Sequence, residues 1–174
     1  MKKILVIGSG RSAVTLIKYL LDYSIDNNWQ VTVADYSKEL AGKAISGHAN
    51  GHAIFFDVRD DNQREKEIKN TDLVISMLPA SMHIMVARDC VRLKKNLVTA
   101  SYVSDDIASL DESAKKAGVV LLNEIGLDPG IDHMSAMQVI DNIKGKGAEV
   151  TSFKSFCGGL VHPDYDNNPW NYKF

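Results

Sequence analysis

The feature that most constrains the fold is a glycine-rich turn placed directly after a short apolar run near the N-terminus. Residues 4–7 are apolar and mostly β-branched, which is typical of a buried parallel strand. The turn that follows reads G-x-G-x-x-A, the dinucleotide-binding fingerprint with alanine at its third position. Its members are Gly8, Ser9, Gly10, Arg11, Ser12 and Ala13.

Each small residue of this turn has a separate purpose in the fingerprint. Gly8 allows the tight turn away from the strand, and Gly10 has no Cβ, so a pyrophosphate can approach the backbone. Ala13 lets the following helix lie close to the sheet. The N–H groups and the positive dipole end of that helix are then expected to face the phosphates.

The sequence on both sides of the turn supports this interpretation. An apolar stripe at helical spacing follows over residues 14–21, and a second apolar strand is predicted over residues 30–34. It ends at Asp35, where the fingerprint expects an acid that binds the adenosine ribose hydroxyls. The alternative is a glycine turn and a solvated aspartate in an α/β domain that binds no nucleotide.

Strand and helix patterns alternate six times along the chain, which predicts an α/β fold of the Rossmann type with a doubly wound parallel sheet. The beginning of a second α/β (α+β) domain is expected to follow, with domains at residues 1–124 and 125–174. The predicted strands cover residues 4–7, 30–34, 52–56, 73–78, 96–99, 119–122 and, in the second domain, 149–157. The predicted helices cover residues 14–21, 37–46, 60–70, 81–91, 105–117 and 131–143.

Ligands bind at the carboxyl ends of the strands in such sheets, so the loops there supply further candidate residues. Asp57, beside Val58, can accept from the adenine amino group, or it can cap a helix or lie in solvent. Leu78 and Pro79 close the fourth strand. The charged run at residues 64–67 is interpreted as a solvated helix face.

Composition excludes several classes of protein. A net charge of −2 without a basic cluster argues against a nucleic-acid surface. No apolar run is long enough for a bilayer, and no signal peptide is recognised, so a cytoplasmic protein is expected. Cys90 and Cys157 are far apart and the histidines have no paired spacing. The sequence therefore predicts free thiols and no metal site.

Several blocks of the sequence resemble one family, the glutamate-forming saccharopine dehydrogenases, also called saccharopine reductases. The blocks lie at residues 72–80, 98–104, 123–133 and 155–160, with shorter matches at 166–169 and 172–174. The run N-E-I-G-L-D-P-G-I-D-H at 123–133 is the most specific of them. The resemblance implies that saccharopine, a secondary amine, is oxidised to glutamate and 2-aminoadipate 6-semialdehyde with hydride transfer to a nicotinamide cofactor.

The resemblance implies three catalytic residues, Tyr102, Asp128 and Cys157. Simpler interpretations stay open for each: Tyr102 can pack at a domain boundary, Asp128 can stabilise a turn, and Cys157 can act as a small hydrophobic residue. With the strand-end loops, the predicted cofactor contacts extend to Asp35, Tyr36, Asp57, Val58, Leu78, Pro79, Ser101, Leu127 and Pro129. The predicted substrate contacts are Ser101, Tyr102, Val103, Ser104, Asp128 and Gly130.

The chain departs from the family pattern in two ways. Fungal members resembling it carry a small residue and then an arginine after the second strand, which suits a 2′-phosphate, whereas Asp35 and Tyr36 stand here. NAD is therefore predicted as the cofactor, and NADP is less favoured. The chain is also much shorter than family members and has no arginine beyond Arg92. A truncated chain, with the cations for the substrate carboxylates in a missing part, is therefore expected.

Alternatives to saccharopine oxidation are a carboxyspermidine-type dehydrogenase of the same superfamily and a non-catalytic, NAD-binding regulatory module. Saccharopine is the expected small-molecule partner, and no nucleic acid or membrane is expected. A homodimer is a further prediction.

Overall fold

The computed structural model describes residues 1–156 and residue 164 of the 174-residue chain. The chain forms two compact units, Met1–Ile131 and Asp132–Phe174. The division into functional domains at residues 124 and 125 stays a prediction.

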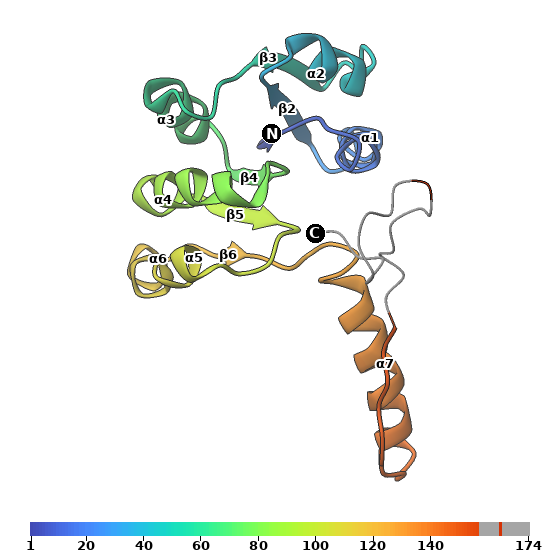
Figure 1. The fold of residues 1–174 in the computed structure, drawn as a ribbon. Helices are drawn as coiled ribbons and strands as arrows, with labels where there is room; N and C mark the ends of the chain where they lie inside the picture. Colours follow the sequence, from blue (N-terminus) through green and yellow to red (C-terminus); the bar gives the residue numbers. More distant parts are fainter. Residues whose placement is uncertain (157–163, 165–174) are drawn as a thin grey trace. The chain divides into compact units, whose positions relative to one another are not determined.

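The first unit is built on a sheet of six parallel strands in the order β3-β2-β1-β4-β5-β6 (Figure 1). This order is that of the Rossmann fold, so the predicted doubly wound sheet is confirmed. The strands are β1 (Lys2–Ile7), β2 (Trp29–Asp35), β3 (Gly51–Phe55), β4 (Leu73–Ser76), β5 (Asn96–Thr99) and β6 (Leu121–Leu122). The direction of winding reverses between β1 and β4, which opens a crevice at their carboxyl ends.

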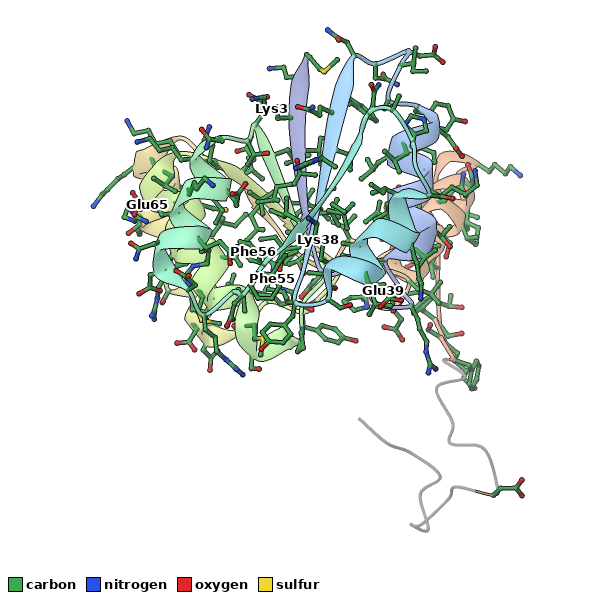
Figure 2. The ribbon with its side chains drawn as sticks, turned by 90° about the horizontal axis from the view of Figure 1, so that it is seen from above. Lys3, Lys38, Glu39, Phe55, Phe56 and Glu65 are labelled. Atoms are coloured by element: carbon green, nitrogen blue, oxygen red, sulfur yellow. The ribbon has the colours of Figure 1, made fainter. Side chains whose placement is uncertain are left out.

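Helices cover both faces of this sheet. They are α1 (Val14–Asp22), α2 (Lys38–Ile45), α3 (Asp61–Lys69), the 3-10 turn η1 (Ala80–Met82), α4 (His83–Leu93), α5 (Asp105–Ala108) and α6 (Asp111–Ala117). Figure 2 shows Glu39 of α2 and Glu65 of α3 on opposite sides of the strands. The second unit contains the long helix α7 (Ile131–Gly145), which begins at the last residue of the first unit.

The core forms two layers because side chains alternate along each strand. Leu5 and Ile7 of β1 pack in the layer under α3 and α4, whereas Ile4 and Val6 pack in the layer under α1 and α2. All four side chains are buried. Full burial of each of these side chains stabilises the fold by about 1.5–3 kcal/mol. Because β1 is anchored on both faces of the sheet, the start of the following turn has a defined position.

The ends of several elements differ from the expected ones. The predicted helix over residues 105–117 is two helices, α5 and α6, and Gly118 ends the second in a left-handed conformation (φ +69°). The strand expected over residues 149–157 is wrong in its described part, because residues 148–156 form no strand. Alternation of apolar residues alone did not distinguish a strand from an extended chain there.

Candidate dinucleotide-binding site

The first glycine of the turn is required by backbone geometry. Gly8 has a φ of +101°, and a Cβ at this position would lie 2.8 Å from the carbonyl oxygen of Met77. Its N–H donates to the carbonyl of Ala34 at 2.8 Å. Only glycine accepts this positive φ together with this close approach without strain. The turn away from β1 therefore requires a glycine at position 8.

Gly10 is different, because nothing in the fold itself requires a glycine there. A Cβ at Gly10 would meet no atom within 4 Å, and its φ lies outside the left-handed region. Within the described part of the chain, the N–H groups of Gly10, Arg11 and Ser12 find no protein acceptor. Three adjacent free donors beside the N-terminus of α1 suit a phosphate, so these residues fit a pyrophosphate.

Ala13 completes the turn as expected. It is 1% exposed and packs in the core layer under α1, and its N–H donates to the carbonyl of Gly10 at 2.9 Å. A larger side chain at this position would move α1 away from the sheet.

Asp35 closes β2 and already accepts three hydrogen bonds from the protein. Its Oδ2 accepts from the backbone N–H of Ser9 at 2.7 Å and from the hydroxyl of Ser9 at 2.8 Å. Its Oδ1 accepts from the N–H of Ser37 at 2.8 Å. Because each carboxylate oxygen has two lone pairs, Oδ1 retains the one acceptor position that the protein leaves open. Asp35 therefore both ties the glycine turn to β2 and offers a single acceptor to a ligand.

A cavity opens beside Asp35, at the carboxyl ends of β1, β2 and β3. Its polar lining comes from Asp35, Tyr36, Asp57 and Arg59. Its apolar lining comes from Ile7, Ala34, Phe56, Val58, Leu78 and Met82. An apolar slot with a few polar groups at its mouth suits a planar heterocycle such as a purine.

Asp57 has a structural contact inside this cavity. Its Oδ1 accepts from the N–H of Arg59 at 2.9 Å, and its own N–H donates to Oε1 of Gln63 at 2.9 Å. The carboxylate therefore stabilises the β3–α3 turn, whereas the residue that caps α3 is Asp60. Contact with a purine amino group stays a prediction for its other oxygen.

The interpretation of residues 64–67 as a solvated face is wrong for Arg64, which is 7% exposed. Its guanidinium donates to Oδ2 of Asp89 at 2.5 Å and to the carbonyl of Val58 at 2.6 Å. Arg64 lies four residues before buried Ile68 on α3, and that spacing places both on the same helix face. The four-residue spacing from Ile68 could have indicated that Arg64 is buried, but a charged residue is ordinarily assigned to the solvent-exposed face of a helix.

The loop after β5 carries the predicted substrate contacts. Ser101 Oγ lies 2.7 Å from Nε2 of buried His83, a histidine that was not predicted as a site residue. The hydroxyl of Tyr102 donates to Oδ1 of Asp128 at 3.2 Å. The structure thus joins two of the three residues predicted to be catalytic, whereas Cys157 lies outside the described residues.

The last two residues of this loop have structural contacts. Ser104 caps α5 by accepting from the N–H of Ile107 at 3.3 Å, and the N–H of Val103 donates to Oε1 of Glu124 at 3.1 Å. Substrate contact by Val103 and Ser104 stays a prediction.

The segment at residues 126–131 folds back on itself and presents Asp128. The N–H of Gly126 donates to the carbonyl of Pro129 at 2.8 Å, and the N–H of Ile131 donates to the carbonyl of Gly126 at 2.9 Å. Gly130 has a φ of +146°, and a Cβ there would lie 2.2 Å from the carbonyl oxygen of Gly126. Glycine is therefore required by this closure. Contacts from Leu127, Pro129 and Gly130 to ligands stay predictions.

The described part of the chain shows neither a metal site nor a membrane-spanning helix. No group of three or more His, Cys, Asp or Glu side chains there is arranged to hold a metal ion. None of the helices there is long and apolar enough to cross a bilayer.

Together, the sheet order, the open N–H groups of the glycine turn and the cavity beside Asp35 define a Rossmann dinucleotide-binding protein. Comparison with known families makes this more specific. Residues 4–122 match the saccharopine dehydrogenase NADP binding domain, and residues 126–174 match the saccharopine dehydrogenase C-terminal domain. The chain belongs to the saccharopine dehydrogenase family, and its cofactor is a nicotinamide dinucleotide.

Individual relatives support this assignment. The chain is 41% identical over 173 residues to a saccharopine dehydrogenase [NADP(+), L-glutamate-forming] from Pyricularia oryzae, covering 99% of this chain and 38% of that one. It is 47% identical over 144 residues to an alpha-aminoadipic semialdehyde synthase from Arabidopsis thaliana, covering 83% of this chain and 14% of that one.

A solved structure gives the same result for the fold. The apo saccharopine dehydrogenase (L-Glu forming) from Saccharomyces cerevisiae matches with a TM-score of 0.82 and 38% identity, over 100% of this chain and 38% of that chain. The chain thus spans well under half the length of these relatives.

Proposed function

We propose that the protein acts in the oxidation of saccharopine to glutamate and 2-aminoadipate 6-semialdehyde, and that this chain supplies the cofactor site and part of the substrate site. In this reaction a hydride leaves the carbon next to the secondary amine for the nicotinamide ring, and the amine carbon becomes an imine. Water adds to the imine, and cleavage of the carbon–nitrogen bond releases glutamate. One cofactor is reduced for each saccharopine consumed.

The observation that carries this proposal is the hydrogen bond between Tyr102 and Asp128 at 3.2 Å. Both residues follow strands at the ligand-binding edge of the sheet, and the whole chain aligns with glutamate-forming saccharopine dehydrogenases. A carboxylate that accepts from a phenol can hold the substrate amine or a water, and the phenol can pass a proton during imine hydrolysis. Asp128 is assigned the amine, and Tyr102 the proton transfer.

The test is the initial rate of reduced-cofactor formation by the full-length protein with saccharopine and NAD. Asp128→Asn and Tyr102→Phe are each expected to lower kcat about 100-fold, the usual contribution of general acid–base catalysis, with unchanged affinity for the reduced cofactor. Tyr19→Phe, at an exposed tyrosine of α1, is the matched control and should keep the wild-type rate. Wild-type protein that binds the cofactor but leaves saccharopine unchanged would contradict this function, as would wild-type rates in both variants.

We propose further that the cofactor is NAD rather than NADP, although the relatives' names specify NADP. Asp35 presents one open acceptor position at the end of β2, which suits a ribose hydroxyl. A 2′-phosphate would instead meet the carboxylate, and contact between like charges can cost several kcal/mol. NAD should therefore bind at least ~10-fold more tightly than NADP, a difference of about 1.4 kcal/mol.

Calorimetric titration of the protein with both cofactors measures this preference. Arg59 is the one cation among the described residues that line the same cavity, so it can offset the phosphate charge. Equal or tighter binding of NADP would contradict the proposal. In that case Arg59→Gln should weaken NADP selectively.

We refer to the cavity with Asp35, Tyr36, Asp57 and Val58 as the adenine side. The nicotinamide side means the ends of β4 and β5 with Ser76, His83, Thr99 and Ser101. This assignment follows the Rossmann fold, in which each half of the dinucleotide lies on one half of the sheet.

A further inference from the structure

A buried chain of hydroxyl groups and one imidazole joins β4 to the loop after β5. Ser76 Oγ, at the end of β4, lies 2.8 Å from Nδ1 of His83. On the other side of the ring, Nε2 lies 2.7 Å from Ser101 Oγ and 3.3 Å from Thr99 Oγ1. Ser76, His83 and Thr99 are at most 3% exposed, whereas Ser101 is half-buried at the ligand-binding edge of the sheet.

The burial of His83 is not required for packing alone. An apolar side chain would fill the position without needing partners for two ring nitrogens, and buried polar groups are retained at a cost unless they are hydrogen-bonded. Burial lowers the pKa of His83, so the imidazole is neutral, with one nitrogen as donor and the other as acceptor. In either tautomer, Nε2 occupies one hydrogen-bonding position of the Ser101 hydroxyl.

That occupancy fixes the direction of the Ser101 hydroxyl. The N–H of Ser101 is also held, since it donates to Thr99 Oγ1 at 3.3 Å. A serine anchored at both its backbone and its hydroxyl has little rotamer freedom left to lose when a ligand binds. Because a serine hydroxyl has one donor and two acceptor positions, the other two positions of Ser101 Oγ are then presented at the carboxyl end of β5.

We propose that His83 is a positioning residue for the nicotinamide half of the cofactor, and that it acts through Ser101. The sheet order supports this, because β4 and β5 carry the half of the crevice opposite to the adenine side. The polar groups of that half of the cofactor, its ribose hydroxyls and carboxamide, can bond to an oriented hydroxyl. Among the residues that the structure describes, the ring nitrogens of His83 contact only Ser76, Thr99 and Ser101.

The experiment compares two ligands, NADH and ADP, by calorimetric titration. ADP carries the adenine and phosphate groups but no nicotinamide, so it reports the adenine side alone. His83→Asn places a polar atom near Nδ1 only, whereas the longer His83→Gln can reach the position of Nε2 and bond to Ser101. His52→Asn, at an exposed histidine of β3, is the matched control.

His83→Asn and Ser101→Ala should each weaken NADH binding about tenfold, the effect of one hydrogen bond, while ADP affinity stays unchanged. His83→Gln should recover most of the loss, and His52→Asn should bind both ligands as wild type does. The double variant His83→Asn/Ser101→Ala should bind NADH no more weakly than Ser101→Ala alone, because both changes remove the same contact.

Three outcomes would overturn the proposal. The first is wild-type NADH affinity in Ser101→Ala, which would overturn the proposal even if His83→Asn fails to fold. The second is an equal loss of NADH and ADP binding in His83→Asn, since a purely structural role would affect both ligands. The third is full additivity in the double variant. The inference rests on the proposed nicotinamide cofactor but not on saccharopine. Wild-type protein that binds neither NADH nor NADPH would contradict both the cofactor and the inference, whereas failed turnover would leave this test intact.

Discussion

On the adenine side, the polar groups lie at the mouth of an open apolar cavity, and Tyr36 is 72% exposed. On the nicotinamide side, Ser76, His83 and Thr99 lie in the interior, and only Ser101 reaches the edge of the sheet. We expect the first region to select a ligand by shape and by the charge of Asp35, and the second to orient the hydroxyl of Ser101 through a buried network. A substitution on the adenine side should therefore change the preference between NAD and NADP. A substitution on the nicotinamide side should change the binding affinity that comes from the nicotinamide half of the cofactor.

The largest effect is expected at Gly10, which lies between the two sides. Gly10→Val should weaken NADH and ADP alike by at least ~100-fold, or about 2.7 kcal/mol, because the new side chain occupies the space expected for the pyrophosphate. The thermal unfolding midpoint should stay the same, since a Cβ there meets no atom within 4 Å. Gly8→Val is the contrasting variant and should lower that midpoint as well. Normal NADH binding by Gly10→Val would mean that the phosphates lie elsewhere.

A tenfold effect is expected at Asp35, confined to the adenine side. Asp35→Asn keeps one acceptor oxygen but removes the charge, so the NAD-to-NADP affinity ratio should fall about tenfold. Asp35→Ser should narrow the ratio too, and it should also destabilise the fold by about 2 kcal/mol, because three N–H or O–H donors lose a charged acceptor. Titration with both cofactors and urea unfolding measure the two effects. An unchanged ratio in Asp35→Asn would show that its charge does not set the preference.

A smaller effect, confined to the nicotinamide side, is expected in the pH dependence of stability. Burial lowers the pKa of His83 below its ordinary value of 6.5, so the unfolded chain takes up the proton first as the pH falls. The free energy of unfolding should therefore decrease as the pH drops through 6.5, until the folded protein is protonated as well. Urea unfolding over this range should show a weaker pH dependence in His83→Gln. The same dependence in both proteins would mean that other groups cause it.

The smallest effect is expected for the labelling of Cys90 by a thiol reagent, which should be slow in the native protein. Cys90 lies on α4, the helix that begins with His83. The thiol is 0% exposed, and burial raises its pKa to about 12. In a Cys157→Ser variant, a thiol reagent should label Cys90 slowly in native buffer and rapidly in urea, because the thiolate is the reactive form. Rapid labelling of the native protein would show that α4 opens, and that the nicotinamide side is less ordered than its burial indicates.

The sequence predicted the adenine side better than the nicotinamide side, and the reason is physical. Gly8, Gly10 and Asp35 carry out local tasks at fixed spacing along one βαβ unit, so their pattern is visible in the chain. His83 depends on Ser76 and Ser101, which β4 and β5 bring together only in the folded sheet. No local periodicity marks a histidine whose partners are 7 and 18 residues away.

Other differences have equally specific causes. The helix predicted over residues 81–91 begins later than expected, because Ser81 lies inside η1 and α4 begins after Met82 without a side-chain cap. A serine that follows a proline gives the same local signal whether a 3-10 turn or an α-helix begins there. Asp35 was expected to bind two ribose hydroxyls, yet Ser9 and Ser37 already use three of its four acceptor positions. Whether protein donors or a ligand use the lone pairs of Asp35 depends on contacts that form only in the folded chain, so the sequence pattern does not show it.

Arg64 connects the adenine side to the helix that carries His83 of the nicotinamide side. Its guanidinium holds the carbonyl of Val58, in the wall of the adenine cavity, and the carboxylate of Asp89 on α4. Asp89 also accepts from Arg92 at 2.8 Å, so the network continues along the helix that begins with His83. A shift of the cavity wall is therefore expected to change contacts of that helix. In the proposed binding mode, occupation of the adenine half should then influence order in the nicotinamide half, which is a coupling free energy within a single binding site.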